Sequence, residues 1–263
     1  MLWRPECPCD ETCLTAGGPE ARTHPLVRAG RWARGCWALL MGAIALMLLP
    51  RPGRAAATAR ALLAALGIRW AVMGAPIRAG ALLAGNHVSW LDILVMMALE
   101  SPRQVRPLRL VAKAEIGAWP LVGSLSRLCG TIFVDRERPR TLPDTVAEVR
   151  SALSSGYPVQ VFPEGTTTCG AHPAPWRPAF FQAALDAGAP VQCFTLLYSS
   201  AAAAFVGDET LLDSLRRVVA LRNLSITVLV DEPMPVSGDR RRLARRLSPR
   251  RSAQERVHDG GRA

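Results

Sequence analysis

From residue 77 onward, short apolar runs alternate with longer stretches in which apolar positions follow a helical period. Apolar runs of about four to eight residues between Gly, Pro and polar turns are typical of buried strands, whereas apolar positions three and four residues apart favour helices. We predict strands at 81–84, 108–112, 131–134, 158–162, 191–197 and 225–230. We predict helices at 90–99, 117–128, 142–154, 179–187 and 209–221. This alternation predicts an α/β fold, a single domain with a mixed, largely parallel sheet flanked by helices.

Two apolar segments precede this region. Residues 36–49 form an uncharged run of 14 residues, which is shorter than the roughly 20 residues of a membrane-spanning helix. The second segment, 55–72, is also apolar but carries Arg60 and Arg69. We expect the two to form an N-terminal apolar helical hairpin that lies on a membrane or dips into it. Two ordinary helices that pack on the core are the alternative.

The net charge of +11 is concentrated at the two ends of the chain. Residues 1–91 carry +6, residues 92–239 carry −2 and residues 240–263 carry +7, which sum to +11. Between residues 21 and 91 nine arginines occur without a single Asp or Glu. Basic and apolar residues without acids are typical of a segment at an anionic membrane surface. Because the sequence has no zinc-finger, RNP or helix-turn-helix signature, we expect membrane lipid, and no nucleic acid, as the partner.

These patterns divide the chain into four parts. We expect a flexible extension at 1–30, the membrane-associating hairpin at 31–74, the α/β domain at 75–238 and a basic tail at 239–263. The tail is arginine-rich and is expected to fray beyond about Pro249.

The seven cysteines show no regular disulfide framework, so a reduced, cytoplasmic compartment fits best. Cys7, Cys9 and Cys13 resemble part of a metal site, but no downstream His/Cys pair has matching ligand spacing. We therefore expect an incidental cluster in a mobile extension and no bound metal. Three histidines lie in Pro- or Gly-rich stretches without an acidic residue at matching spacing, and we predict no role for them: His24, His172 and His258.

An imidazole and a carboxylate fall at a predicted junction between strand and helix. His87 follows the strand at 81–84, and Asp92 lies about one turn into the next helical pattern, so their side chains can converge. A carboxylate bonded to one imidazole nitrogen fixes the tautomer and leaves the other nitrogen as a base. This is a Ser-His-Asp triad without its serine, which predicts acyl transfer to a substrate hydroxyl. A pair that only caps the helix is the alternative.

Two further segments place polar groups at predicted strand ends. The sequence Phe-Pro-Glu-Gly-Thr at 162–166 follows one strand, where ligands of open α/β sheets gather. The segment 130–136 ends a second strand with Arg136, a fixed cation well suited to bind a phosphate. Taken singly, the first could be a plain turn, and Arg136 could form a surface ion pair with Asp135.

Taken in order, these segments resemble the motifs of the glycerolipid acyltransferase family, particularly its bacterial 1-acylglycerol-3-phosphate acyltransferases of the PlsC type. Residues 86–92, Asn-His-Val-Ser-Trp-Leu-Asp, are similar to the family's first block, His-x4-Asp. The stretch from Lys113 to 123 resembles the approach to the second block, and 130–136 and 162–166 resemble the second and third blocks. The resemblance covers about residues 75–235.

The resemblance implies a catalytic domain at 75–238, with His87 as general base and Asp92 as its orienting partner. It assigns acceptor binding to Asn86, Lys113, Gly130, Arg136, Glu164, Gly165 and Thr166. It implies an enzyme that moves a fatty acyl group from acyl-CoA or acyl-carrier protein to the sn-2 hydroxyl of lysophosphatidic acid, giving phosphatidic acid for phospholipid biosynthesis. Such an enzyme would need no cofactor and no metal, and would associate with the cytoplasmic face of the inner (cell) membrane.

Some positions depart from the family pattern. Thr167 and Thr168 stand where many relatives have Arg, Trp-Arg-Pro-Ala at 176–179 replaces a common Phe-Lys-x-Gly, and the fourth block at 189–194 keeps one proline. These departures leave open another lysolipid acceptor, such as lyso-ornithine lipid. A non-catalytic lipid-binding protein is a third alternative, although binding alone would not need a base such as His87.

Overall fold

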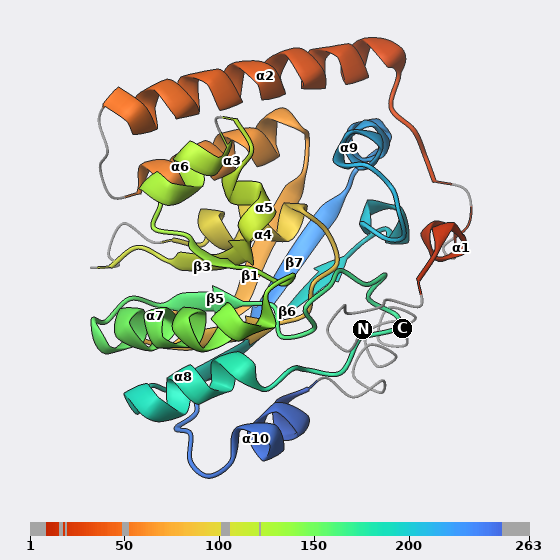
Figure 1. The fold of residues 1–263 in the computed structure, drawn as a ribbon. Coiled ribbons are helices and arrows are strands. Elements are labelled where there is room, and N and C mark those ends of the chain that lie inside the picture. Colours follow the sequence, from red (N-terminus) through yellow and green to blue (C-terminus); the bar gives the residue numbers. More distant parts are fainter. Residues whose placement is uncertain are drawn as a thin grey trace.

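The computed structural model describes residues 9–15, 18, 20–48, 53–100, 106–120 and 122–248. A seven-stranded sheet lies at its centre, with helices on both faces (Figure 1). In spatial order the strands are β1 (Arg69–Gly74), β7 (Ser225–Val230), β6 (Val191–Tyr198), β2 (Leu82–Gly85), β5 (Val159–Val161), β3 (Arg109–Lys113) and β4 (Ile132–Val134). All six strands expected from the sequence are present, and their ends agree within one residue.

The sheet is mixed and largely parallel, as predicted. β6, β2, β5, β3 and β4 run parallel, β7 runs antiparallel to β6, and β1 runs parallel to β7. At the centre, Ala84 of β2 pairs with Val161 of β5 on one side and Cys193 of β6 on the other. The carboxyl ends of the five parallel strands therefore meet at one edge, where the side chains that follow them can converge.

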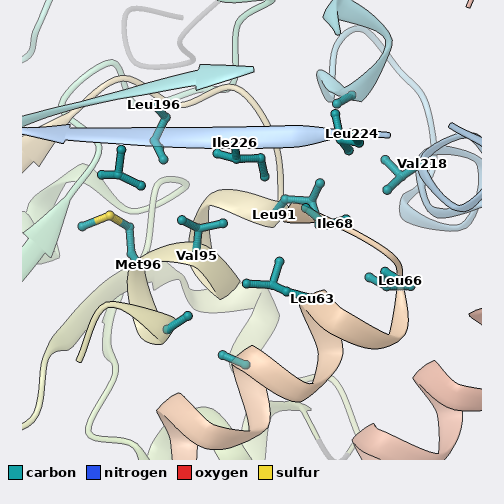
Figure 2. Close-up of a cluster of buried hydrophobic side chains, with 14 of the residues drawn as sticks. Leu63, Leu66, Ile68, Leu91, Val95, Met96, Leu196, Val218, Leu224 and Ile226 are labelled. Carbon is teal, nitrogen blue, oxygen red and sulfur yellow. The ribbon is translucent and has the colours of Figure 1, made fainter. Parts of the chain in front are cut away.

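Two apolar layers hold the helices on the sheet. On one face pack α3 (Arg54–Ala65), α4 (Leu91–Ala98) and α9 (Leu211–Ala220). Figure 2 shows part of this layer, in which Leu63 of α3 and Val95 of α4 lie near Ile226 of β7. On the other face pack α7 (Leu142–Ser154), α8 (Ala179–Ala187) and α10 (Arg240–Leu247). Because side chains alternate along a strand, Leu82 of β2 belongs to the second layer and Leu83 to the first.

The helix expected at 55–72 is wrong in its second half. α3 ends at Ala65, Gly67 takes a left-handed φ of 72°, and residues 69–74 form the edge strand β1. A glycine with positive φ commonly ends a helix because it lacks the steric penalty of a Cβ. The last residues of the predicted second helix therefore belong to the sheet.

The apolar helix of the N-terminal region is longer than the sequence predicts. α2 (Pro25–Leu48) has 24 residues, because the arginine-bearing turns before residue 36 are also helical. Among the described helices, α2 alone has the length and apolar composition of a membrane-crossing helix. It lies across the outside of α3 (Figure 1), and Gly42 lets the two helices approach so closely that a Cβ there would be 2.2 Å from Thr58. The helical hairpin is thus present as α2 and α3.

The described parts of the two terminal regions, 9–30 with gaps and 239–248, contain more regular structure than expected. Within the predicted flexible extension, α1 (Glu11–Leu14) is helical, Cys9 is buried, and Thr23 hydrogen-bonds to the backbone of Ala220. In the predicted basic tail, α10 packs on α8; residues beyond 248 lie outside the described part. The helix predicted at 117–128 is two helices, α5 (Ala114–Gly117) and α6 (Val122–Leu128). The described residues also contain two 3₁₀ turns, η1 (Pro139–Thr141) and η2 (Ala201–Ala203).

Candidate active site

The turn between β2 and α4 brings His87 and Asp92 together. His87 Nδ1 lies 2.8 Å from Asp92 Oδ2, and the imidazole remains 18% exposed while the carboxylate is fully buried. The predicted convergence of these two side chains is therefore present. Among the described residues, no serine hydroxyl hydrogen-bonds to the imidazole, and that of nearby Ser89 accepts from the Leu91 N–H instead.

The surroundings of Asp92 fix which imidazole nitrogen carries the proton. Asp92 Oδ2 also accepts from the backbone N–H groups of Val88 at 2.7 Å and Ser89 at 3.0 Å. Its Oδ1 accepts from the hydroxyl of Tyr198, whose pKa is raised well above its usual value by burial and by the Asp92 charge. A carboxylate acceptor at 2.8 Å favours the tautomer with Nδ1–H, so Nε2 of His87 is left as the base.

Phe162 sets the plane of the imidazole. Its ring stacks on that of His87, with centroids 3.8 Å apart and planes that differ by 3°. Phe194 of β6 meets Phe162 edge to face at 6.1 Å. The packing of two aromatic rings thus limits the rotation that the Asp92 hydrogen bond alone would allow to His87.

Glu164 connects the His87 turn to the loop after β5 through hydrogen bonds to the backbone. Its Oε1 accepts from the backbone N–H of His87 at 3.2 Å, and its Oε2 accepts from the N–H of Ala174 at 3.0 Å. The carboxyl group is buried, and burial, with a smaller contribution from the Asp92 charge, raises its pKa to about 7. Thr168 joins the same turn, since its N–H donates to the His87 carbonyl at 2.8 Å. Glu164 therefore holds the backbone of His87, which differs from the acceptor contact implied by the resemblance.

Cationic side chains gather beside this turn. Arg136, which follows β4, donates to the carbonyl of Gly165 in the loop after β5. Burial lowers the pKa of Arg136, and the charge of Arg177 lowers it further. Lys113, at the end of β3, is close enough for the Arg136 charge to lower its pKa, after the larger effect of partial desolvation. Because Lys113 pairs with Val134 in the β3–β4 register, Lys113 and Arg136 lie near each other, and Arg177 is a third cation in this region.

A groove beside the turn contains these arginines. Its lining includes Arg136, Gly165 and Arg177 together with apolar side chains from β4, α7 and α8. Phe162 also lines this groove. The same phenyl ring therefore stacks on the imidazole of His87 and forms part of the groove wall. Through Phe162, the candidate base and the arginines therefore lie on neighbouring surfaces.

Two further predicted acceptor-binding residues, Asn86 and Gly130, take other places, and Thr166 stays beside the groove residue Gly165. Both polar groups of the buried Asn86 amide are paired with the backbone of Leu196 in β6, at 3.0 and 2.7 Å, so Asn86 anchors the turn to the sheet. Gly130 lies before β4, at the opposite end of that strand from Arg136, and with φ of 71° it ends α6 next to Arg109. Thr166 stays in the loop next to Gly165, and its hydroxyl lies 3.5 Å from the Thr167 carbonyl.

Four residues of the site receive no role of their own from the sequence. Phe162 was part of a predicted motif without a role of its own, whereas Tyr198, Thr168 and Arg177 were assigned no role. Tyr198 had a usable signal, because it is one of only two tyrosines and directly follows a predicted strand. The contacts of the other two depend on a loop whose path the sequence does not reveal.

Comparison with known proteins is consistent with this geometry. Residues 71–196 match the family model described as Acyltransferase. The chain is 37% identical over 154 residues to a 1-acyl-sn-glycerol-3-phosphate acyltransferase of Neisseria gonorrhoeae, covering 57% of this chain and 58% of that relative's length. It is 37% identical over 192 residues to a lyso-ornithine lipid O-acyltransferase of Pseudomonas aeruginosa, covering 70% of this chain and 71% of the relative.

A similar fold occurs in a solved structure. The crystal structure of the 1-acyl-sn-glycerophosphate acyltransferase PlsC from Thermotoga maritima superposes with a TM-score of 0.59 at 16% identity, covering 89% of this chain and 95% of that one. At this level of identity the match shows the fold alone.

Proposed function

Because the chain belongs to the acyltransferase family, we propose that it transfers a fatty acyl group from a thioester donor to the hydroxyl of a lysolipid. The proposed donor is acyl-CoA or acyl-carrier protein, and the leading acceptor is lysophosphatidic acid, acylated at sn-2 to phosphatidic acid. One observation carries the proposal: the His87–Asp92 pair lies beside a groove that contains Arg136 and Arg177.

The chemistry follows from the free nitrogen of the imidazole. Nε2 of His87 removes the proton of the acceptor hydroxyl while that oxygen attacks the thioester carbonyl carbon. The Asp92 carboxylate, 2.8 Å from Nδ1, stabilises the imidazolium that forms. The carbon–sulfur bond of the tetrahedral intermediate then breaks, and the imidazolium returns its proton to the leaving thiolate. An ester and a free thiol result, and the steps use neither a cofactor nor a metal.

The cations suit an acceptor with a negative head group. A phosphate in the groove would meet the guanidinium of Arg136, with Lys113 and Arg177 nearby. Charge-assisted and bidentate bonds of this kind orient a phosphate as well as attract it. With the head group held there, the glycerol hydroxyl of the acceptor can reach past Phe162 to His87.

The exposed apolar surface of α2 supports membrane association. Four apolar side chains of α2 are exposed to solvent: Trp37, Leu40, Ile44 and Met47. Around the start of α6, which contacts α2, Trp119 and Val122 are exposed as well. Because α2 packs along α3, α2 could cross a bilayer only if α3 entered the bilayer as well. We therefore propose that α2 lies in the plane of the membrane, on the cytoplasmic face of the inner membrane, with acyl chains following this apolar surface.

Lyso-ornithine lipid is the second candidate acceptor. The Pseudomonas relative with that name aligns over more of this chain than the Neisseria relative does, and Thr167 and Thr168 provide no cation after the Phe-Pro-Glu-Gly-Thr motif. An ornithine head group carries both a carboxylate and an ammonium. Glu115, whose charge acts on both Lys113 and Arg136, would pair with that ammonium.

An acceptor panel tests the proposal. Full-length protein in detergent is incubated with acyl-CoA or acyl-carrier protein and with lysophosphatidic acid, lyso-ornithine lipid or neutral lysolipids, and products are followed by mass spectrometry. We expect phosphatidic acid as the main product, and a loss of about 1,000-fold or more in kcat for His87→Ala. Full activity of His87→Ala would disprove the base mechanism, and lipid binding without turnover would indicate a non-catalytic protein.

A further inference from the structure

Two segments that are distant in the chain meet next to the candidate active site. Cys9 and Cys13 lie on either side of the start of α1, and Cys169 and His172 lie in the loop after β5. The three sulfur atoms and one imidazole nitrogen all lie within 4.8 Å of one another. Cys169 Sγ is 3.4 Å from His172 Nδ1, and the Cys169 N–H donates to Cys9 Sγ at 3.3 Å.

We propose that Cys9, Cys13, Cys169 and His172 bind a structural zinc ion. Three thiolates and one imidazole are a typical tetrahedral ligand set for Zn²⁺. With bonds of about 2.0–2.3 Å, the ligand atoms of such a site are about 3.4–3.8 Å apart, so the most distant atoms here need to approach by roughly 1 Å. The Cys169–His172 pair already has the right separation. The N–H bond to Cys9 Sγ is the kind of outer contact that orients a thiolate ligand.

This proposal replaces the expectation of an incidental cluster without metal. Cys9 and Cys13 supply the spacing Cys-x3-Cys, and Cys169 and His172 supply Cys-x2-His about 160 positions later. The second pair has an ordinary ligand spacing, and the sequence does not reveal it as a partner because its distance from the first pair is set only by the fold. Cys7 lies outside the described residues.

The cluster lies where a bound ion would stabilise the turn that contains His87. Cys9 packs with Val88, Ala204 and Val206 in a small apolar cluster directly behind the His87 turn. Thr168, the neighbour of Cys169, donates to the carbonyl of His87 at 2.8 Å. A bound zinc ion would therefore fasten the N-terminal segment to the loop that supports the candidate base. Because four protein ligands complete the coordination, the ion would have no open position for substrate.

Metal analysis of the full-length protein tests the proposal. The protein is purified in detergent with a reducing agent and without chelators, and its metals are measured by inductively coupled plasma mass spectrometry. We expect about one zinc per chain. After removal of zinc, Co²⁺ titration should give the visible d–d bands of a tetrahedral site and a thiolate charge-transfer band in the near ultraviolet. Less than about a tenth of a zinc per chain, together with a cobalt spectrum lacking the thiolate band, would overturn the proposal.

Matched variants locate the ion. Two test variants change proposed ligands that are less buried than Cys9: Cys13→Ser and His172→Ala. Two control variants change an exposed cysteine and an exposed histidine outside the cluster: Cys36→Ser and His24→Ala. Zinc content should fall several-fold in the first two and stay unchanged in the controls. Equal zinc in all four variants would place the ion elsewhere, and a Cys9–Cys169 disulfide in non-reducing peptide maps of freshly isolated protein would assign these thiols to a crosslink. Either result contradicts the proposal.

Discussion

The imidazole of His87 lies flat on the phenyl ring of Phe162, with the ring centroids 3.8 Å apart and the planes within 3° of each other. Phe162 also lines the groove that contains Arg136 and Arg177. A side chain without polar atoms therefore fixes the plane of the candidate base and forms part of the candidate acceptor site.

Replacement of this ring should slow the reaction without unfolding the protein. Phe162→Leu keeps an apolar side chain but removes the stacked face, and aromatic pairs contribute about 0.5–1.5 kcal/mol beyond their buried area. We expect kcat to fall by about two- to tenfold, because the imidazole samples unproductive orientations. Steady-state kinetics with the preferred acceptor measure this, and thermal unfolding shows whether the fold is kept. An unchanged kcat would mean that Asp92 alone orients His87.

The Tyr198 hydroxyl should matter through Asp92. Tyr198→Phe removes the hydroxyl that donates to Asp92 Oδ1, and a hydrogen bond to a charged group is worth about 1.5–3 kcal/mol. We expect kcat to fall about tenfold or more, with a changed pH profile of kcat because the carboxylate loses a partner. Tyr157→Phe is a matched control, since the other tyrosine of the chain precedes β5 and its hydroxyl accepts from Arg106. Equal losses in both variants would indicate a general effect on folding.

Glu164 should make stability depend on pH. Burial raises its pKa in the folded protein from 4.5 to about 7, so the folded state holds the proton more tightly than the unfolded chain does. The stability gained from this proton is fully present below about pH 4.5 and is lost as pH rises through about 7. Relative to Glu164→Gln, the free energy of unfolding of the wild type should therefore fall by up to about 3 kcal/mol between about pH 5 and pH 8.

Urea unfolding of both proteins across this pH range measures the difference. The Gln variant is the reference because it cannot titrate and keeps nearly the same shape. A parallel pH dependence of the two proteins would show that Glu164 does not carry the proton.

Arg136 should determine affinity for an anionic acceptor. Arg136→Ala removes the guanidinium that donates to Gly165 and lies in the groove, and we expect KM for lysophosphatidic acid to rise about tenfold or more. KM for the thioester donor should change little. Arg138→Ala is the control, because that side chain is 80% exposed and pairs with Asp135 at the surface. A similar increase in KM in both variants would show that general positive charge, and not this site, attracts the acceptor.

Membrane binding should depend on the outer face of α2. Leu40→Asp puts a charge on a side chain that is 51% exposed, and Leu212→Asp does the same at a 48% exposed leucine of α9. We expect the first variant to release the protein from anionic phospholipid vesicles in a flotation assay, because a charge at an interfacial helix opposes insertion. The second should float like the wild type. Release by both, or by neither, would contradict the proposed orientation of α2.

The sequence was a good guide wherever the signal is local. The six strands from β2 to β7 follow from short apolar runs between turns, and His87 and Asp92 are only five positions apart across one turn. Arg136 lies two residues after β4, so the sequence places it correctly at the carboxyl edge of the sheet. In each case the residue and the strand or turn that positions it lie within the same short stretch of chain.

Residues whose roles depend on distant partners were missed or misjudged. β1 looks helical in sequence and becomes a strand because it pairs with β7, more than 150 positions later. Asn86, implied in substrate binding, is held by Leu196, and Tyr198 reaches Asp92 from the end of β6. The local pattern cannot show these contacts, because a side chain's partner depends on which strands become neighbours.

The sequence by itself determined the α/β class, the acyltransferase motifs and the candidate base, since hydrophobic periodicity and the His-x4-Asp spacing are properties of neighbouring residues. Only the tertiary structure decided that Glu164 supports the backbone of His87, that Phe162 joins the base to the cationic groove, and that Cys169 meets Cys9. The physical reason is the packing of the parallel strands. It brings their carboxyl ends and following loops to one edge, and so sets distances that no local pattern encodes.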